Sequence, residues 1–353
     1  MFKALVIATA LLTSTDAFAC SSFLVEENNH VVVGKNFDMV LGHGSVMSNQ
    51  RSLAKRGLVR GAAPAEWVSK YGSLTFNWVA KELPQGGMNE RGLVVEVLWL
   101  ERAEFPSGDP RPGVGELQWA QYQLDNYATT EEVLAHLDEL AIQKFVAPLH
   151  YFVCDATKAC AVIDPVAGKY ERYSGDRLPF RVLTNSLYQA SVQAASAFRD
   201  TCSSVPEGYD SLARFSRLAC SVGATTGEDI ISRGFDLLAT VAGLSGVDAN
   251  PNYKTHWSIV YDLTAKKIHF KSALNDAVRT VALAQFDFDC KTPTLVYDVN
   301  HPLKAENVRS HFHRYSKADT RRLIEATSAG FAHLPPPMID GLVEYASSQR
   351  CAR

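Results

Sequence analysis

The chain has 353 residues, of which 46% are hydrophobic and 21% are charged, and its formal net charge is -3. This is the composition of a globular protein with enough apolar material for one large core or two modest ones, and it excludes a disordered chain. The small net charge and the lack of long runs of like charge argue against a nucleic-acid partner.

The N-terminal segment has the pattern of a secretory signal peptide. Met1 to Lys3 gives a basic start, Ala4 to Leu12 is an apolar run, and Ala17 to Ala19 is a small-x-small cleavage site directly before Cys20. The apolar run is too short to span a bilayer, and no later segment approaches ~20 uninterrupted apolar residues. We therefore expect a periplasmic or secreted protein, cleaved before Cys20 and without stable membrane insertion.

A cysteine directly after a signal peptide has a second interpretation. Lipoproteins also begin at such a cysteine, which carries the lipid that anchors the chain. Lipoprotein sites have small residues before the cysteine, and the bulky Phe18 between Ala17 and Ala19 fits that pattern poorly. A lipid-anchored, non-enzymatic envelope protein with a lipidated Cys20 remains the alternative.

Beyond Cys20 the first predicted elements are β-strands. They are short runs rich in Val, Leu, Phe or Trp, bounded by Gly, Asn or charge, at residues 22–26, 30–34, 73–80 and 92–100. Between residues 115 and 140 the apolar spacing becomes helical, and Thr129 and Glu132 have the spacing of a capping box at the start of a second helix.

The second half repeats this change from strand to helix. Strands are expected at residues 151–154, 161–164, 169–173, 181–183, 257–263, 267–271 and 278–283, and helical segments at 209–243, 317–329 and 337–348. This order suits two stacked sheets with helices on their outer faces. We predict a single α+β domain over residues 20–353.

The chain contains seven cysteines, an odd number for an exported protein. If Cys20 is set aside, six remain for three disulfide bridges. Cys154 and Cys160 suit a bridge across a short turn, and order along the chain suggests Cys202 with Cys220 and Cys290 with Cys351. Sequence alone does not fix this connectivity.

A free N-terminal Cys20 would combine a nucleophile and a base. Its α-amino group would titrate near ~7.7 and its thiol near ~8.5, so the amine can take the thiol proton and later pass it to a leaving amine. Removal of the signal peptide would create that amine.

Six segments after this point resemble the choloylglycine hydrolase family. They are CSSF at 20–23, GKNFD at 34–38, GMNERGL at 87–93, LTN at 183–185, ARFSR at 213–217 and WSIVYD at 257–262. The family contains conjugated bile acid hydrolases and penicillin V acylases and belongs to the N-terminal nucleophile hydrolase superfamily. The resemblance covers most of the mature chain and implies an αββα sandwich of two antiparallel sheets covered by helices.

The resemblance also implies a role for each matching position. Cys20 would be the nucleophile, and Asp38 would orient its α-amino group or thiol. The side-chain amide of Asn185 and the backbone N–H of Asn89 would form the oxyanion hole. Arg214 would lie near the sulfur and favour the thiolate.

Three further positions are expected to bind substrate. Lys35 stands where the family usually has Arg, so it keeps the charge and loses the planar fork of donors. Met39 stands where the Gram-negative acylases tend to have Trp, and Trp99 matches a Leu-Trp-Leu stretch near their pocket.

No cofactor or metal is expected. His301, His311 and His313 have some likeness to metal ligands, but no acidic partner stands at ligand spacing, and the mechanism needs no metal. Phosphate-binding loops, serine elbows and dinucleotide-binding glycine patterns do not occur.

We therefore expect an exported amidohydrolase that cleaves the linear amide bond of a small N-acyl substrate through a thioester on Cys20. Penicillin V-like amides are the first expectation, and conjugated bile acids and N-acyl homoserine lactones are alternatives. The resemblance further implies a homotetramer, for which the sequence itself offers no support.

Overall fold

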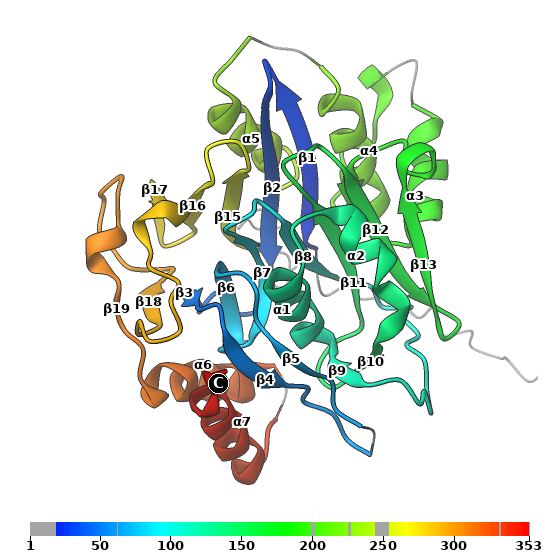
Figure 1. Cartoon of the computed structure of the whole chain (residues 1–353). Helices are drawn as coiled ribbons and strands as arrows, with labels where there is room; N and C mark the ends of the chain where they lie inside the picture. Colours follow the sequence, from blue (N-terminus) through cyan, green and yellow to red (C-terminus); the bar gives the residue numbers. More distant parts are fainter. Residues whose placement is uncertain are drawn as a thin grey trace, which may run out of the picture.

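The fold is described by a computed structural model covering residues 19–61, 63–198, 202–224, 227–243, 254–331 and 333–352 (Figure 1). Apart from Ala19, the expected signal peptide lies outside these residues. Within the described ranges, none of the helices combines the length and the apolar character that crossing a membrane requires.

The first of two main sheets has six strands in the order β14-β1-β2-β15-β16-β17, and neighbouring strands are antiparallel. Their bounds are β1 Ser21–Glu27, β2 His30–Asp38, β14 Val182–Leu183, β15 Thr255–Asp262, β16 Lys267–Ser272 and β17 Asn275–Ala282.

The hairpin of β1 and β2 has a local cause. Asn28 and Asn29 both have positive φ, 49° and 65°, which is the backbone of a two-residue turn whose twist matches the strands it joins. Glu27 therefore pairs with His30, and the register continues along both strands. It brings the start of β1, directly after Cys20, beside the end of β2.

The second sheet has nine strands in the order β13-β12-β11-β8-β7-β6-β3-β18-β19. Their bounds are β3 Ser45–Asn49, β6 Ser73–Ala80, β7 Leu83–Asn89, β8 Val94–Trp99, β11 Leu149–Cys154, β12 Cys160–Val166, β13 Lys169–Ser174, β18 Leu295–Asp298 and β19 His313–Arg314. Smaller strands are β4 Leu53–Arg56, β5 Glu66–Val68 and β20 Arg350–Cys351 in one sheet, and β9 Gly113–Gly115 with β10 Ala141–Gln143 in another.

Helices cover the outer faces of both main sheets. They are α1 Glu116–Asn126, α2 Thr130–Ala135, α3 Tyr188–Ser196, α4 Ser211–Ser221, α5 Ile230–Ala239, α6 Lys317–Gly330 and α7 Pro336–Ser348. α5 packs on β2 and β15, α1 packs on β7 and β8, and α6 packs on β6 (Figure 1). This arrangement confirms the expected α+β sandwich, and the capping box of Thr129 and Glu132 is present.

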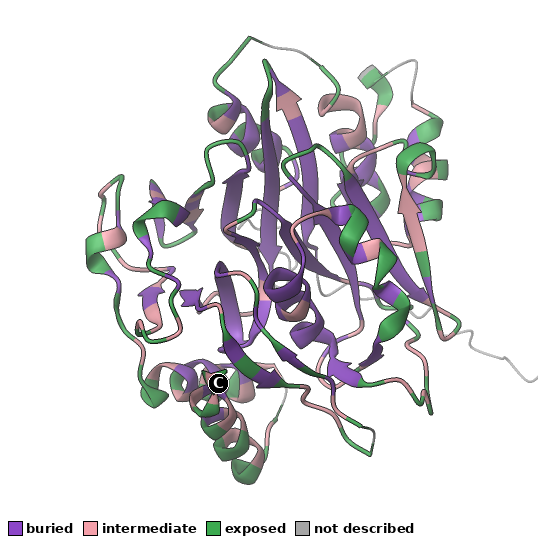
Figure 2. Cartoon of the chain, in the orientation of Figure 1, coloured by how far each residue is buried: buried purple, intermediate pink, exposed green. Residues whose placement is uncertain are grey.

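The space between the two sheets is filled by aromatic side chains. The Phe76 ring of β6 meets Tyr261 at 6.2 Å and Phe270 at 5.5 Å between centroids, and Phe37 stacks on Trp257 at 4.1 Å. Figure 2 shows both sheets buried along most of their length. The two facing sheets therefore bury the residues at the end of β2 that the sequence assigns to the site.

All three disulfide bridges expected from chain order are present: Cys154–Cys160, Cys202–Cys220 and Cys290–Cys351. Cys20 is the free cysteine, and it is buried. The three pairs leave Cys20 as the single free thiol.

Candidate active site

Cys20 directly precedes β1, which belongs to the first sheet. Only 4% of its surface is exposed, and its thiol donates to the backbone oxygen of Asp38 at 3.9 Å. The hairpin register produces this contact, because Ser21 pairs with Asn36. Burial raises the pKa of the Cys20 thiol, and the positive charge of Lys35 opposes that shift. A thiol in this setting needs a base to become a thiolate.

The carboxylate of Asp38 is fully buried beside Cys20. Among the described residues, no donor reaches either of its oxygens with full hydrogen-bond geometry, and the Thr255 side chain is the polar neighbour that favours its charged form. Burial raises the pKa of Asp38 to about 7, against the opposing charge of Arg214. In this structure Cys20 is still joined to Ala19, so its nitrogen is a peptide nitrogen. The carboxylate is thus an acceptor in need of a donor next to the cysteine.

Arg214 joins the other parts of the site. It comes from α4, whose first turn is capped by the Asp210 side chain, and only 1% of it is exposed. Its Nη1 donates to the backbone oxygens of Ala19 and Cys20 at 2.6 and 2.8 Å and to Ser21 Oγ at 2.7 Å. The guanidinium group therefore fixes the backbone on both sides of Cys20. Its contact with Cys20 is to the backbone carbonyl oxygen of that residue.

The same guanidinium sets the orientation of Asn185. Arg214 Nη2 donates to Asn185 Oδ1 at 2.8 Å, and because arginine has donors only, the amide oxygen must face it. The amide nitrogen then points the other way and donates to the Trp99 backbone oxygen at 2.9 Å. An amide NH₂ carries two hydrogens, so one remains for a developing negative charge.

The structure corrects the expectation for Asn89. Its backbone N–H donates to the Leu93 oxygen at 3.0 Å and is not free for an oxyanion. Its side chain donates to Leu124 and Tyr127 and accepts from the backbone N–H groups of Arg91 and Leu93. Asn89 therefore fixes the end of β7 against α1, which is a structural task.

Lys35 also lies away from any substrate surface. Its ammonium group donates to the Val97 oxygen at 2.6 Å and pairs with Glu96 at 3.2 Å, and both side chains are 1% exposed. This ion pair links β2 to β8 between the sheets. The predicted substrate contact of Lys35 is therefore not supported; its charge acts on Cys20 and Asp38 from within the core.

Met39 and Trp99 do lie beside Cys20. Both line a small cavity of about 20 Å³ that also touches Cys20, which is room for about one water molecule. Phe331, directly after α6, packs edge-on against Trp99 and Trp78 with centroids 6.2 and 5.0 Å apart.

Several residues close to Cys20 were not expected from the sequence: Trp78 and Phe331 line the cavity, and Ser21 accepts from Arg214. No functional role was assigned to Ser21, Trp78 or Phe331 from the sequence. Ser21 does belong to the CSSF segment that resembles the family. Of the three histidines compared with metal ligands, His313 bonds Asp319 at 2.9 Å; the described residues include no group of three or more ligand-type side chains placed to hold a metal.

Comparisons with known proteins place the chain in a family. The family model of the linear amide C-N hydrolases, choloylglycine hydrolase family, matches residues 20–200, just over half of the chain. The chain belongs to the choloylglycine hydrolase family. The match begins at Cys20, the residue around which the buried polar groups gather.

Other similarities support this membership of the choloylglycine hydrolase family. A penicillin V acylase from Pectobacterium atrosepticum is 34% identical over 150 residues, which cover 37% of this chain and 39% of that relative. The penicillin V acylase structure from Agrobacterium tumefaciens superimposes with a TM-score of 0.75 at 25% identity, covering 84% of this chain and 98% of that one. A mutant conjugated bile acid hydrolase from Clostridium perfringens, at 17% identity, TM-score 0.69 and coverage of 81% and 98%, shows the shared fold.

Within this member of the choloylglycine hydrolase family, the structure brings together Cys20, Asp38, Asn185 and Arg214 and places Asn89 and Lys35 elsewhere. The catalytic roles of the four gathered residues stay predictions.

Proposed function

We propose that this choloylglycine hydrolase family member is an exported N-terminal nucleophile amidohydrolase that cleaves N-acyl amides of the penicillin V type. One observation carries the proposal: the free thiol of Cys20 is buried beside Asp38, whose carboxylate is also buried, and the Cys20 nitrogen is held in the peptide bond to Ala19. Removal of residues 1–19 would turn that nitrogen into an amine.

The proposed reaction has two halves. The α-amine of Cys20 takes the thiol proton, the sulfur attacks the amide carbon, and the carbonyl oxygen becomes negatively charged. The C–N bond then breaks, the amine product leaves with the proton from the ammonium group, and a thioester remains on the sulfur. Water, deprotonated by the same amine, hydrolyses the thioester to release the acid and the free thiol.

The surrounding residues suit this sequence of charges. Asn185 is held by Arg214 with its NH₂ group toward the cavity wall formed by Trp99, where it can donate to the oxyanion. Asp38 would hold the α-ammonium group that forms during attack. Because Asp38 and Arg214 are buried and Asn185 is half-buried, their electrostatic effect is less screened than at the surface.

The choice of substrate and location rests on similarity and sequence. Two similar proteins carry the name penicillin V acylase, which favours aryloxyacetyl amides over conjugated bile acids and N-acyl homoserine lactones. The signal peptide pattern and the disulfides support a periplasmic or secreted protein. The buried position of Cys20 argues against a lipid anchor. A lipid attached to the sulfur could reach a membrane only if Cys20 moved out of the core.

The test is the Cys20→Ser variant. It should fold and be exported like the wild type and lose at least ~100-fold of its penicillin V hydrolysis, since a hydroxyl is far less acidic than a thiol. Release of 6-aminopenicillanic acid measures the activity, and glycocholate and an N-acyl homoserine lactone assayed in parallel rank the substrates. Near wild-type turnover by the variant would refute the proposal.

A further inference from the structure

Asn185 follows a very short strand at the edge of the first sheet. β14 pairs with β1 over two residues, Val182 with Phe23 and Leu183 with Ser22, and then ends. Thr184 and Asn185 therefore lie beyond the last pair of this ladder. The backbone that carries the Asn185 amide must be fixed by bonds to other parts of the molecule.

A histidine of the second sheet supplies one of those bonds. His150 belongs to β11 and is fully buried, and its Nε2 donates to the backbone oxygen of Thr184 at 2.7 Å. A carbonyl oxygen only accepts, so Nε2 carries the hydrogen of this bond. The contact joins the second sheet to the residue directly before Asn185.

Asp164 on β12 fixes the ring of His150. Its Oδ1 lies 2.9 Å from His150 Nδ1, and its Oδ2 accepts the backbone N–H of Tyr188, the first residue of α3, at 2.7 Å. Both ring nitrogens and both carboxylate oxygens are thus used, and both side chains are fully buried. Because Thr184 precedes Asn185 and Tyr188 follows it, the pair of His150 and Asp164 holds the segment on both sides of Asn185.

The second sheet also carries the acceptor of the Asn185 amide. Leu149, directly before His150, pairs with Trp99 of β8, and the backbone oxygen of Trp99 accepts from Asn185 Nδ2. His150 therefore fixes the Asn185 backbone relative to the strand pair on which that acceptor lies. On the opposite side, the Ser211 hydroxyl of α4 accepts the backbone N–H of Asn185 at 2.9 Å.

We propose that His150, oriented by Asp164, is a positioning residue for the Asn185 amide in the hydrolysis at Cys20. The inference rests on the proposed amidohydrolase function and adds a residue that acts through the Thr184 backbone. One hydrogen of the Asn185 amide is used by Trp99, and a shift of the backbone would turn the other away from the oxyanion. A misplacement of about 1 Å can cost about 10²-fold in rate.

The first test compares three substitutions of His150. His150→Leu removes both donors and should lower kcat for penicillin V at least about 10-fold, with KM nearly unchanged. His150→Gln keeps an amide donor at the position of Nε2 and should stay within about threefold of the wild-type kcat. His150→Asn, whose shorter amide reaches toward Asp164 only, should lose as much as His150→Leu. The Gln and Asn variants decide the question even if the Leu variant does not fold, and equal kcat values in these two would overturn the inference.

The matched control is Asn49→Leu. Asn49 is a fully buried polar residue of the same sheet and donates to Ser73 at 3.1 Å and Thr75 at 2.9 Å. Like His150→Leu, this variant should lose stability, but it should keep its kcat.

A double-mutant cycle separates positioning of the amide from general damage to the fold. In an Asn185→Ala background, His150→Leu should change kcat by less than about threefold, because the amide that it positions is gone. Additive losses in the double variant would overturn the inference.

Hydrogen exchange separates this inference from the proposed chemistry. In the Cys20→Ser protein, the backbone amides of residues 184–188 should exchange at least about 10-fold faster with His150→Leu than with Asn49→Leu. Unaltered exchange rejects the role of His150, whatever the activity of the protein. Faster exchange, together with penicillin V hydrolysis that survives Cys20→Ser, rejects the proposed nucleophile and supports the role of His150 in holding Asn185.

Discussion

At the scale of single residues, Asp38 would link cleavage of the chain before Cys20 to the reactivity of the Cys20 thiol. A buried carboxylate without a well-placed donor costs free energy, and in the chain that retains Ala19 none of the described residues reaches it with full hydrogen-bond geometry. The hairpin of β1 and β2 brings Cys20 next to Asp38. Cleavage before Cys20 would create an ammonium group there, which satisfies the carboxylate and provides the base at once.

This view predicts a pH-dependent stability for a chain beginning Met-Ala19-Cys20. Burial raises the pKa of Asp38 to about 7, against about 3.9 when unfolded. Between about pH 4 and pH 7 the folded state holds a proton that the unfolded state has lost, so the free energy of unfolding should fall as pH rises, by about 4 kcal/mol in total. Urea unfolding at several pH values measures it.

The control is the same chain with Asp38→Asn, which cannot titrate at this position. The difference in the free energy of unfolding between the two chains should shrink toward acid pH. In the processed protein, the ammonium group of Cys20 opposes the rise in pKa, and the slope should be smaller. Identical slopes for all three proteins would show that Asp38 is not the buried acid described here.

Asn185 gives a kinetic prediction, because its amide is held by Arg214 and has one hydrogen to spare. Asn185→Ala should lower kcat about 10²–10³-fold with little change in KM, as expected for a contact made in the transition state. The free energy of unfolding of the Asn185→Ala protein should fall by only about 1 kcal/mol. Kinetics and thermal unfolding on one preparation compare the two effects, and an unchanged kcat would remove Asn185 from the oxyanion hole.

The site could be predicted from sequence where local structure decides it. Cys20 and Asp38 lie on one hairpin, and its register brings them together. Asn89 was misassigned because a Met-Asn-Glu-Arg-Gly turn looks the same whether the Asn bonds its own backbone or a substrate. Phe331 could not be predicted, since only the packing of α6 on β6 carries it to Trp99.

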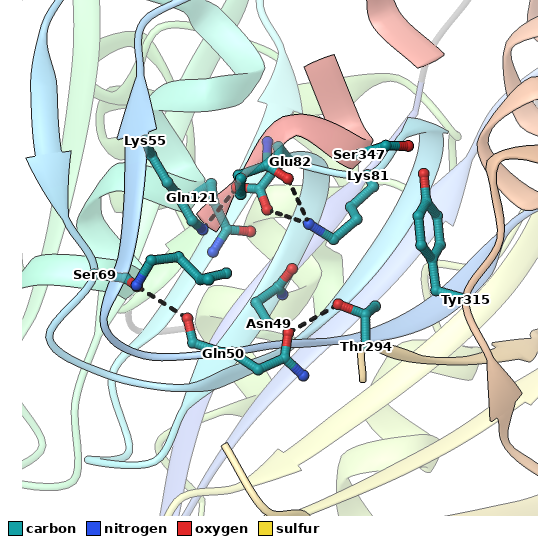
Figure 3. A network of polar contacts seen from close by, with 12 residues as sticks. Asn49, Gln50, Lys55, Ser69, Lys81, Glu82, Gln121, Thr294, Tyr315 and Ser347 are labelled. Atoms are coloured by element: carbon teal, nitrogen blue, oxygen red, sulfur yellow. Dashed lines mark hydrogen bonds and ion pairs between the residues drawn. The ribbon is translucent and has the colours of Figure 1, made fainter. Parts of the chain in front are cut away.

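At the scale of elements, a buried ion network joins β4, the turn between β6 and β7, and α1. The ammonium group of Lys55 lies 2.7 Å from Glu82 and 2.9 Å from Asp125, with all three side chains fully buried. Lys81 meets Glu82 at 2.7 Å and donates to Gln349 at the end of α7. Figure 3 shows Lys55, Lys81 and Glu82 converging in this network.

Lys55 should therefore be far more important for stability than its neighbour on the same strand. Lys55→Met leaves Asp125 buried without its counter-ion and should lower the free energy of unfolding by about 3–5 kcal/mol. Arg56 pairs with Glu66 at 3.7 Å on the surface, with 66% and 73% of the side chains exposed, and Arg56→Met should cost at most ~1 kcal/mol. Urea titrations of both variants check this, and comparable losses would contradict it.

Elements with a strong periodic pattern could be predicted, and short ones could not. The expected strands at residues 73–80 and 267–271 agree with β6 and β16 to within one residue. β3, β18 and α3 were missed, as was β7, whose Leu-Pro-Gln-Gly-Gly-Met-Asn sequence has little strand character and two glycines. β3 and β7 take their conformation from pairing, because β3 lies between β6 and β18 and β7 lies between β6 and β8.

At the scale of the whole molecule, the sequence indicated two covered sheets and could not indicate the strand order. β2 pairs with β15, more than two hundred residues later in the chain, and β3 pairs with β18 across a similar separation. Alternation of apolar residues indicates which face of a strand is buried. It does not indicate which other strand pairs with it. Those distant pairings close the sandwich over Cys20, which therefore lies in the core.

This position makes activity depend on where the chain begins. In the structure Ala19 is 2% exposed and Arg214 holds its carbonyl oxygen at 2.6 Å, so a chain with Ala19 attached can fold around it. A protein beginning Met-Ala19-Cys20, with no enzyme present to trim it, should therefore be folded and inactive on penicillin V, because its base is an amide nitrogen. Circular dichroism and intact mass verify the fold and the extension, and a matched chain beginning at Cys20 is the active control. Full activity with the extension intact would mean that another group takes the thiol proton. If activity rises in parallel with the loss of Met-Ala19, as followed by intact mass, turnover depends on the free amine of Cys20.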